Sequence, residues 1–254
     1  MNKIAVSSPS FSHVPVERLA PKIFSEFGAW EIVAEHRHHL SKIQGYLREY
    51  LGSHEVELRV HAPLSDINIA SFSDRVREAS LSDVLETIRM AGELGAKCVT
   101  VHPGLVSPSS SLDLDRVRAL VRESLLKVSK ASEEHGVPVA IENMPRIRWL
   151  IFRDPDELLK VIEGTGLGIC FDAGHANTSG NVDAWLDLAP RFINVHLHDN
   201  RGERDEHLVL GEGTVPFDKI LKALHGVYKG PYVIESADLP QGIQSRDILK
   251  KMLG

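Results

Sequence analysis

The chain has 254 residues, of which 43% are hydrophobic and 25% are charged, and its formal net charge is −6. These values are typical of a soluble globular chain long enough to bury one substantial core. The acidic balance gives no overall attraction to nucleic acid or to an anionic membrane, although bound metal cations would reverse the sign locally.

Membrane and export signals are missing from the sequence itself. No apolar run approaches the roughly 18 residues that a membrane span needs, and the N-terminal MNKIAVSSPS has too few apolar residues for a signal peptide. Cys98 and Cys170 each lie in an apolar, β-like run, which predicts buried thiols in a reducing compartment. We therefore expect a cytoplasmic protein without membrane contact, and the sequence indicates no protein partner.

Short apolar segments recur along the chain, each followed by turn-forming or polar residues. They predict eight strands, at residues 4–6, 29–33, 56–60, 97–101, 137–141, 167–171, 192–195 and 232–234. Two long amphipathic helices follow the N-cap residues Ser73 and Asp113 and end at Gly95 and Gly136. Further helices are predicted at residues 15–27, 43–51, 155–162, 182–188, 216–225 and 244–252.

This alternation of apolar strands and amphipathic helices predicts a parallel sheet covered by helices. Eight such units in about 250 residues indicate an α/β fold with a single (β/α)₈ barrel, one domain over residues 1–254. A doubly wound open sheet is the alternative. It is disfavoured because no G-x-G-x-x-G follows the first strand.

Histidine or carboxylate side chains stand where six of the predicted strands end. In chain order they are His61, His102, Glu142, Asp172 with His175, His196 and Glu235. All strands of a (β/α)₈ barrel end on one face, so these groups should converge there, and Asp205 and His207 can fold back over the same mouth. Imidazole and carboxylate without cysteine suit Zn²⁺, Mn²⁺ or Fe²⁺.

Eight short motifs together resemble the xylose-isomerase-like barrel superfamily. They are HAP at His61, HPG at His102, ENMP at Glu142, FDAGH at Asp172, HLHDN at His196, DEH at Asp205, LGEG at Leu210 and the final Glu235. The superfamily includes endonuclease IV, which acts on abasic DNA, and single-metal sugar isomerases and epimerases. The resemblance covers nearly the whole chain.

The isomerase pattern implies one divalent metal, Mn²⁺, Co²⁺ or Mg²⁺, held by Glu142, Asp172, His196 and Glu235. The two glutamates would then be catalytic and move the proton on the carbon next to the carbonyl. His175 and Arg201 would hold hydroxyls of a sugar or sugar phosphate.

The endonuclease IV pattern implies up to three Zn²⁺ ions and nine ligand residues, all present here. His61, His102 and Glu142 would hold the first ion, Glu142, Asp172, His196 and Glu235 the second, and His175, Asp205 and His207 the third. Asp205 and His207 distinguish the endonuclease IV pattern from the isomerase pattern, because a single-metal isomerase has no physical need for them. We therefore favour a zinc-dependent phosphoester hydrolase, with the isomerase or epimerase as the alternative.

Three further groups stand near the predicted mouth. His198 shares a strand face with His196 and can orient a metal ligand through a hydrogen bond, as can Asp199 and Asn200. The cluster at residues 35–39, EHRHH, follows the second strand and offers a substrate contact or a surface helix start. Arg146, Arg148 and Trp149 are the nearest approach to a basic, aromatic surface for a phosphate backbone, or else cover the mouth.

Overall fold

Eight parallel strands form a closed barrel in the computed structural model, which describes residues 3–254. Each strand pairs with the next along the chain, and the last pairs with the first. The strands are β1 (Ile4–Ser7), β2 (Ala29–Val33), β3 (Glu57–His61), β4 (Val99–Val101), β5 (Val139–Glu142), β6 (Gly168–Asp172), β7 (Phe192–Leu197) and β8 (Tyr232–Glu235). The single (β/α)₈ barrel predicted from the sequence is confirmed.

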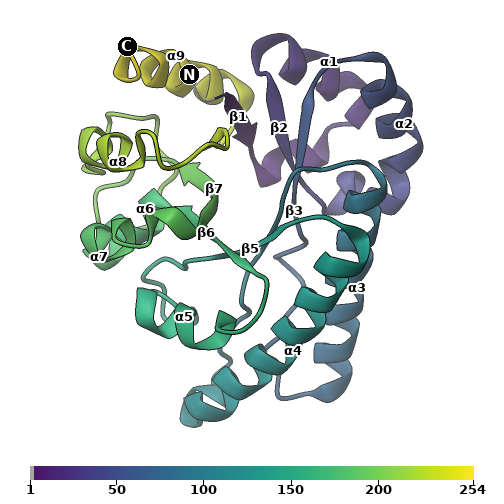
Figure 1. Ribbon diagram of the computed structural model, residues 1–254, viewed down its shortest axis with the longest axis vertical. Helices are drawn as coiled ribbons and strands as arrows, with labels where there is room; N and C mark the ends of the chain where they lie inside the picture. The colour runs from purple at the N-terminus through teal and green to yellow at the C-terminus, as the bar shows by residue number, and fades with distance from the viewer. Residues whose placement is uncertain (1–2) are drawn as a thin grey trace.

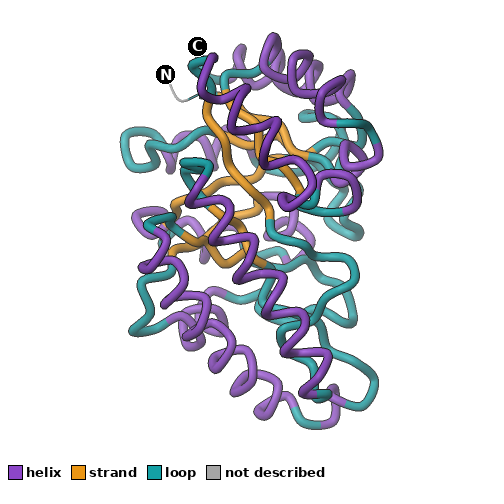
Figure 2. The backbone as a smooth tube through the Cα atoms, turned by 90° about the vertical axis from the view of Figure 1, so that its right-hand side faces the viewer, coloured by secondary structure: helices purple, strands orange, loops and turns teal. Residues whose placement is uncertain are grey.

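Helices surround the strands, which occupy the centre of the molecule (Figures 1 and 2). They are α1 (Val16–Glu26), α2 (Leu40–Ser53), α3 (Asp74–Glu93), α4 (Leu114–His135), α5 (Pro155–Ile162), α6 (Ala173–Ser179), α7 (Val182–Leu186), α8 (Phe217–Leu224) and α9 (Leu239–Met252). The two longest, α3 and α4, lie side by side along the outside. No helix within residues 3–254 is both long and apolar enough to cross a membrane.

Strand β2 shows how the two layers are built. Trp30 is fully buried and meets Phe24 of α1 edge-on, so it faces the helices. Side chains alternate along a strand, so the neighbouring Glu31 faces the barrel interior, where it is also fully buried. Apolar residues therefore fill the layer between strands and helices, while the barrel interior on the side of Glu31 holds polar groups.

Three local predictions differ from the structure. Helix α6 was not expected, because AGHANTS is short and has no apolar period; Asp172 caps it by accepting a hydrogen bond from the His175 backbone N–H. Ser73 makes no side-chain capping bond to α3. Helix α9 begins at Leu239, five residues before the predicted start, because Asp238 accepts from the Gln241 N–H.

Candidate metal centre

Glu142, the last residue of β5, lies at the centre of the site with both carboxylate oxygens engaged. Its Oε2 lies 3.2 Å from His61 Nε2 and 3.0 Å from His102 Nε2. Its Oε1 lies 3.2 Å from His196 Nδ1. The carboxylate is therefore shared between two groups of side chains, as a ligand bridging two cations would be.

The second group joins the ends of four strands: Glu142 of β5, Asp172 of β6, His196 of β7 and Glu235 of β8. His196 Nδ1 faces Glu235 Oε1 at 3.1 Å and Asp172 Oδ2 at 3.9 Å. Asp172 Oδ2 is buried and has no hydrogen-bond partner. A buried carboxylate oxygen without a partner is costly unless a cation faces it, so this oxygen fits a metal ligand.

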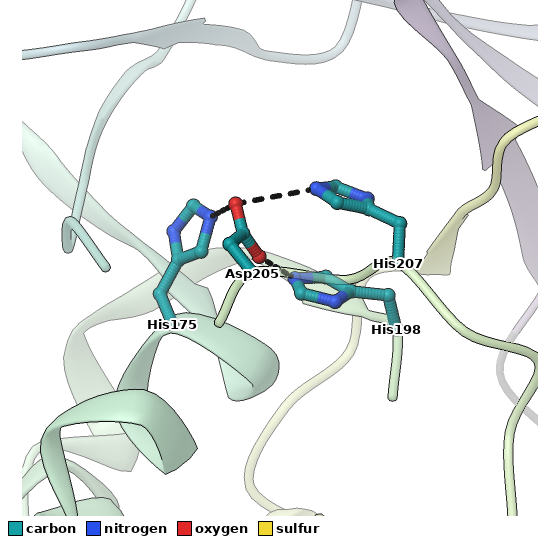
Figure 3. Close-up of side chains that lie close together, drawn as sticks. All are labelled: His175, His198, Asp205 and His207. Carbon is teal, nitrogen blue, oxygen red and sulfur yellow. Dashed lines mark ion pairs between the residues drawn. The ribbon is translucent and has the colours of Figure 1, made fainter. Parts of the chain in front are cut away.

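The third group is centred on Asp205, in the loop after β7 (Figure 3). Asp205 Oδ2 lies 3.3 Å from His175 Nε2 and 3.4 Å from His207 Nε2. Two ligands about 2.1 Å from one tetrahedral Zn²⁺ lie about 3.4 Å apart. The spacing of these three side chains therefore fits a single ion.

The loop that carries Asp205 and His207 is held by Asp199. This buried carboxylate accepts hydrogen bonds from the backbone N–H groups of Gly211 and Gly213 at 2.8 Å and of Val215 at 3.1 Å. The backbone of Asp199 also pairs with that of Leu208, next to His207. Asp199 thus fixes the loop rather than orienting His196 or Asp205 by a side-chain contact.

Glu31, in the barrel interior on β2, is a functional candidate that the sequence did not reveal. Its Oε1 lies 2.9 Å from His196 Nε2, and its Oε2 accepts from Asn194 Nδ2 at 2.7 Å. A histidine that binds metal through one nitrogen commonly donates its other N–H to a carboxylate, which fixes the ring. The signal in the sequence was a lone glutamate inside an apolar strand.

Buried carboxylates and imidazoles shift one another's ionisation. Burial raises the pKa of Glu142, but His196 and His102 outweigh it, and the pKa lies well below its ordinary value. Burial lowers the pKa of His175, but the carboxylates of Asp172 and Asp205 raise it well above its ordinary value. The pKa of Asp205 is lowered by His175 and His207 despite its burial. The carboxylates are therefore anionic at neutral pH and attract positive charge.

All nine ligand candidates predicted from the sequence meet in these three groups: His61, His102 and Glu142; Glu142, Asp172, His196 and Glu235; and His175, Asp205 and His207. His198 clusters with the third group, since its ligand atom lies within 4.8 Å of those of His175, Asp205 and His207. The donors of these three groups are imidazole nitrogens and carboxylate oxygens, as divalent zinc, manganese and cobalt accept, and the buried Cys170 thiol lies within 4.8 Å of Glu142 and His196 as well.

Several other residues singled out in the sequence have other partners. Arg201, expected near sugar hydroxyls, is exposed and pairs with Glu206 at 2.7 Å. In the cluster at residues 35–39, Glu35 accepts from the N–H groups of Leu64 and Ser65, so it anchors the loop after β3. Asn200 bonds to the Gly174 carbonyl and not to His196 or Asp205.

The closed parallel strands define a TIM barrel, and the histidine and carboxylate groups gathered where the strands end could hold metal ions. Residues 25–252 match the family model described as xylose isomerase-like TIM barrel, and the chain belongs to this family.

Two relatives at the sequence level match most of the chain. The protein MJ1311 of Methanocaldococcus jannaschii is 37% identical over 99% of this chain and 89% of its own. A probable endonuclease 4 of Mycobacterium tuberculosis is 33% identical over 70% of this chain and 72% of its own.

Solved structures share the fold. The crystal structure of a D-tagatose 3-epimerase-like protein is 35% identical, with a TM-score of 0.91 over 99% of this chain and 97% of its own. The TTHB071 protein of Thermus thermophilus, soaked with ZnCl₂, is 24% identical with a TM-score of 0.77 over 98% and 96%. The family thus holds proteins whose names include both epimerases and endonucleases.

Proposed function

We propose that this protein is a zinc-dependent phosphoester hydrolase whose substrate is an abasic site in duplex DNA. The observation that carries the proposal is the group of His175, Asp205 and His207, in which Asp205 Oδ2 lies 3.3 Å from His175 Nε2 and 3.4 Å from His207 Nε2. It adds a third cation position to the two that share Glu142. Cations bound there would polarise a phosphodiester and share the negative charge of its transition state.

The chain's own residues have separate tasks in this proposal. Glu142 fixes the spacing of the first two positions because each of its oxygens faces a different group. Glu235, at the open end of β8, is only 12% exposed at its side chain. Burial raises the pKa of Glu235, but His196 and His207 lower it by more, so Glu235 is an anion at neutral pH. His175 holds Asp205 in place from α6.

The rim of the mouth supports a nucleic-acid substrate. Trp149, in the loop after β5, is 43% exposed, and the Arg148 guanidinium lies 4.9 Å from the centre of its ring. Exposed aromatic rings and arginines are the groups that stack on bases and contact phosphates. We place the activity in the cytoplasm, which agrees with the buried, unpaired Cys98 and Cys170.

A metal-dependent sugar or sugar-phosphate isomerase or epimerase is the second candidate, with Glu142 and Glu235 as its acid/base pair. It is favoured by the 35% identical structure titled as D-tagatose 3-epimerase-like. Against it, both oxygens of Glu142 face histidines, which leaves no free oxygen to take a proton from carbon. The alternative also leaves Asp205 and His207 without a task.

The test is incision of a labelled duplex with one abasic site by the zinc-loaded protein. We expect incision at that site, and a loss of about 100-fold or more in the Asp205→Asn variant. Asp115→Asn, an exposed carboxylate on α4, is the matched control. Absence of incision, together with solvent deuterium entering a ketose next to its carbonyl, would replace this proposal with the second.

A further inference from the structure

His198 stands one residue beyond β7, on the strand face that also carries Asn194 and His196. Its side chain is completely buried. Its Nε2 lies 3.1 Å from Asp172 Oδ1. The same nitrogen lies 3.4 Å from Asp205 Oδ1 (Figure 3). One imidazole nitrogen therefore reaches two carboxylates that belong to different groups of the site.

The ring orientation argues that His198 is not itself a ligand of the third position. The rings of His198 and His207 are stacked, with centroids 4.0 Å apart and planes 10° apart. An imidazole nitrogen binds a metal in the plane of its ring, so one ion cannot lie in both of these nearly parallel planes. His207 and His175 face Asp205 Oδ2, whereas His198 faces the other oxygen, Oδ1.

The proton of His198 has one suitable position. Its Nδ1 is buried without a hydrogen-bond partner, and a buried N–H without an acceptor is costly. Nε2 therefore carries a proton, which Asp172 Oδ1 accepts at 3.1 Å, and the buried Asp205 Oδ1, which has no hydrogen-bond partner, lies 3.4 Å from the same nitrogen. Because this hydrogen bond holds Oδ1 of Asp172, the unpartnered Oδ2 of the same carboxylate stays directed into the second group.

Gly174 makes room for this arrangement. A Cβ atom at Gly174 would lie 2.1 Å from His198 Cε1 and 2.4 Å from its Nε2. Real atoms do not approach so closely, so any side chain at position 174 would displace the ring. The glycine in FDAGH and the second histidine in HLHDN are thus two parts of one contact.

From these contacts we propose that His198 is a positioning residue that couples the second and third metal positions by holding Asp172 and Asp205 together. The proposal rests on the proposed function for the existence of the third position. It assigns Gly174 a specific part as well, since the glycine permits the His198 ring to reach both carboxylates. A merely space-filling ring would not need its Nε2 at these two oxygens.

The experiment measures zinc affinity, not activity. Each protein is titrated with Zn²⁺ against a chelating indicator, and its bound zinc is counted by elemental analysis. We expect His198→Ala to bind at least one ion about 10- to 100-fold more weakly than the wild type. His198→Gln, which keeps an N–H donor, should recover part of the loss, and His225→Ala, an exposed histidine on the outer surface, should lose nothing.

Gly174→Ala provides the second arm. It should weaken binding as His198→Ala does, and the double variant should be no worse than either single variant, because both remove the same contact. Unchanged affinities in His198→Ala, or losses that multiply in the double variant, would overturn the proposal. If His198→Ala does not fold, the comparison is made between His198→Gln and Gly174→Ala.

The two proposals fail in different ways. A wild-type protein that binds one ion would overturn the three-metal hydrolase. The His198 proposal would then be decided on that single ion, since His198 also contacts Asp172 of the second group. Weaker binding of that ion by His198→Ala would support the proposal that His198 positions Asp172, and an unchanged zinc affinity would refute it.

Discussion

The two halves of the candidate site are held in place by different means. Glu142 and His196 extend from strands of the closed barrel, and their side chains are at most 1% exposed. Asp205 and His207 lie in a loop held by Asp199, and their side chains are 17% and 30% exposed. The first half is fixed by the strands of the barrel, whereas the second half depends on a few hydrogen bonds to Asp199. The loop-held half is therefore the part of the site that can differ between proteins with the same fold.

The largest effect is expected from breaking the buried half at Glu142. Glu142→Gln removes the shared anion, so the protein should lose two of the three proposed ions, and the proposed phosphodiester hydrolysis should fall by about 1000-fold. Elemental analysis and the abasic-site assay measure this. Glu134→Gln, exposed on α4, is the control, and a Glu142→Gln protein that keeps all its metal would contradict the bridging role.

A substitution at Glu31 tests whether this carboxylate inside the barrel holds His196 in place. Glu31→Gln removes the charge opposite His196 Nε2, so we expect zinc affinity to fall by about 10- to 100-fold, with the third ion unaffected. Zinc titration measures both. An affinity within twofold of the wild type would show that Glu31 merely fills the interior.

Asp199→Ala breaks the loop-held half alone. It leaves four backbone N–H groups without their acceptor, those of Asn200, Gly211, Gly213 and Val215, so we expect the unfolding free energy to fall by about 2–4 kcal/mol in urea. The ion at Asp205 should be lost while the two at Glu142 remain. Retention of all three would mean that the loop does not need this anchor.

The smallest effect concerns the anchor of the loop after β3. Burial raises the pKa of Glu35, but hydrogen bonds from Leu64 and Ser65 lower it below its ordinary value. A lowered pKa stabilises the fold above the unfolded-state value near 4.5, and this contribution disappears as the pH falls through the folded-state value. Glu35→Gln should therefore cost about 1–2 kcal/mol at pH 7 and much less once the pH lies below the folded-state pKa, measured by urea unfolding. An equal cost at both pH values would contradict this.

Much of the site followed from the sequence because it follows from the fold. Once eight apolar strands imply a barrel, polar groups such as His102 and Glu142 at strand ends must meet on one face. The sequence predicted only that Asp205 and His207 can fold back over this face, and their grouping with His175 was implied by the resemblance, since loop paths have no periodic signal. Glu31 escaped notice because its role depends on the distance to His196 across the barrel, which no local pattern encodes.

The metal content of the wild-type protein and of Asp205→Asn tests the central claim most directly. After saturation with Zn²⁺ and removal of the excess, elemental analysis should give about three ions per chain for the wild type and about two for Asp205→Asn, because only the third group loses its anion. One ion per chain that is retained in Asp205→Asn would contradict the three-metal account.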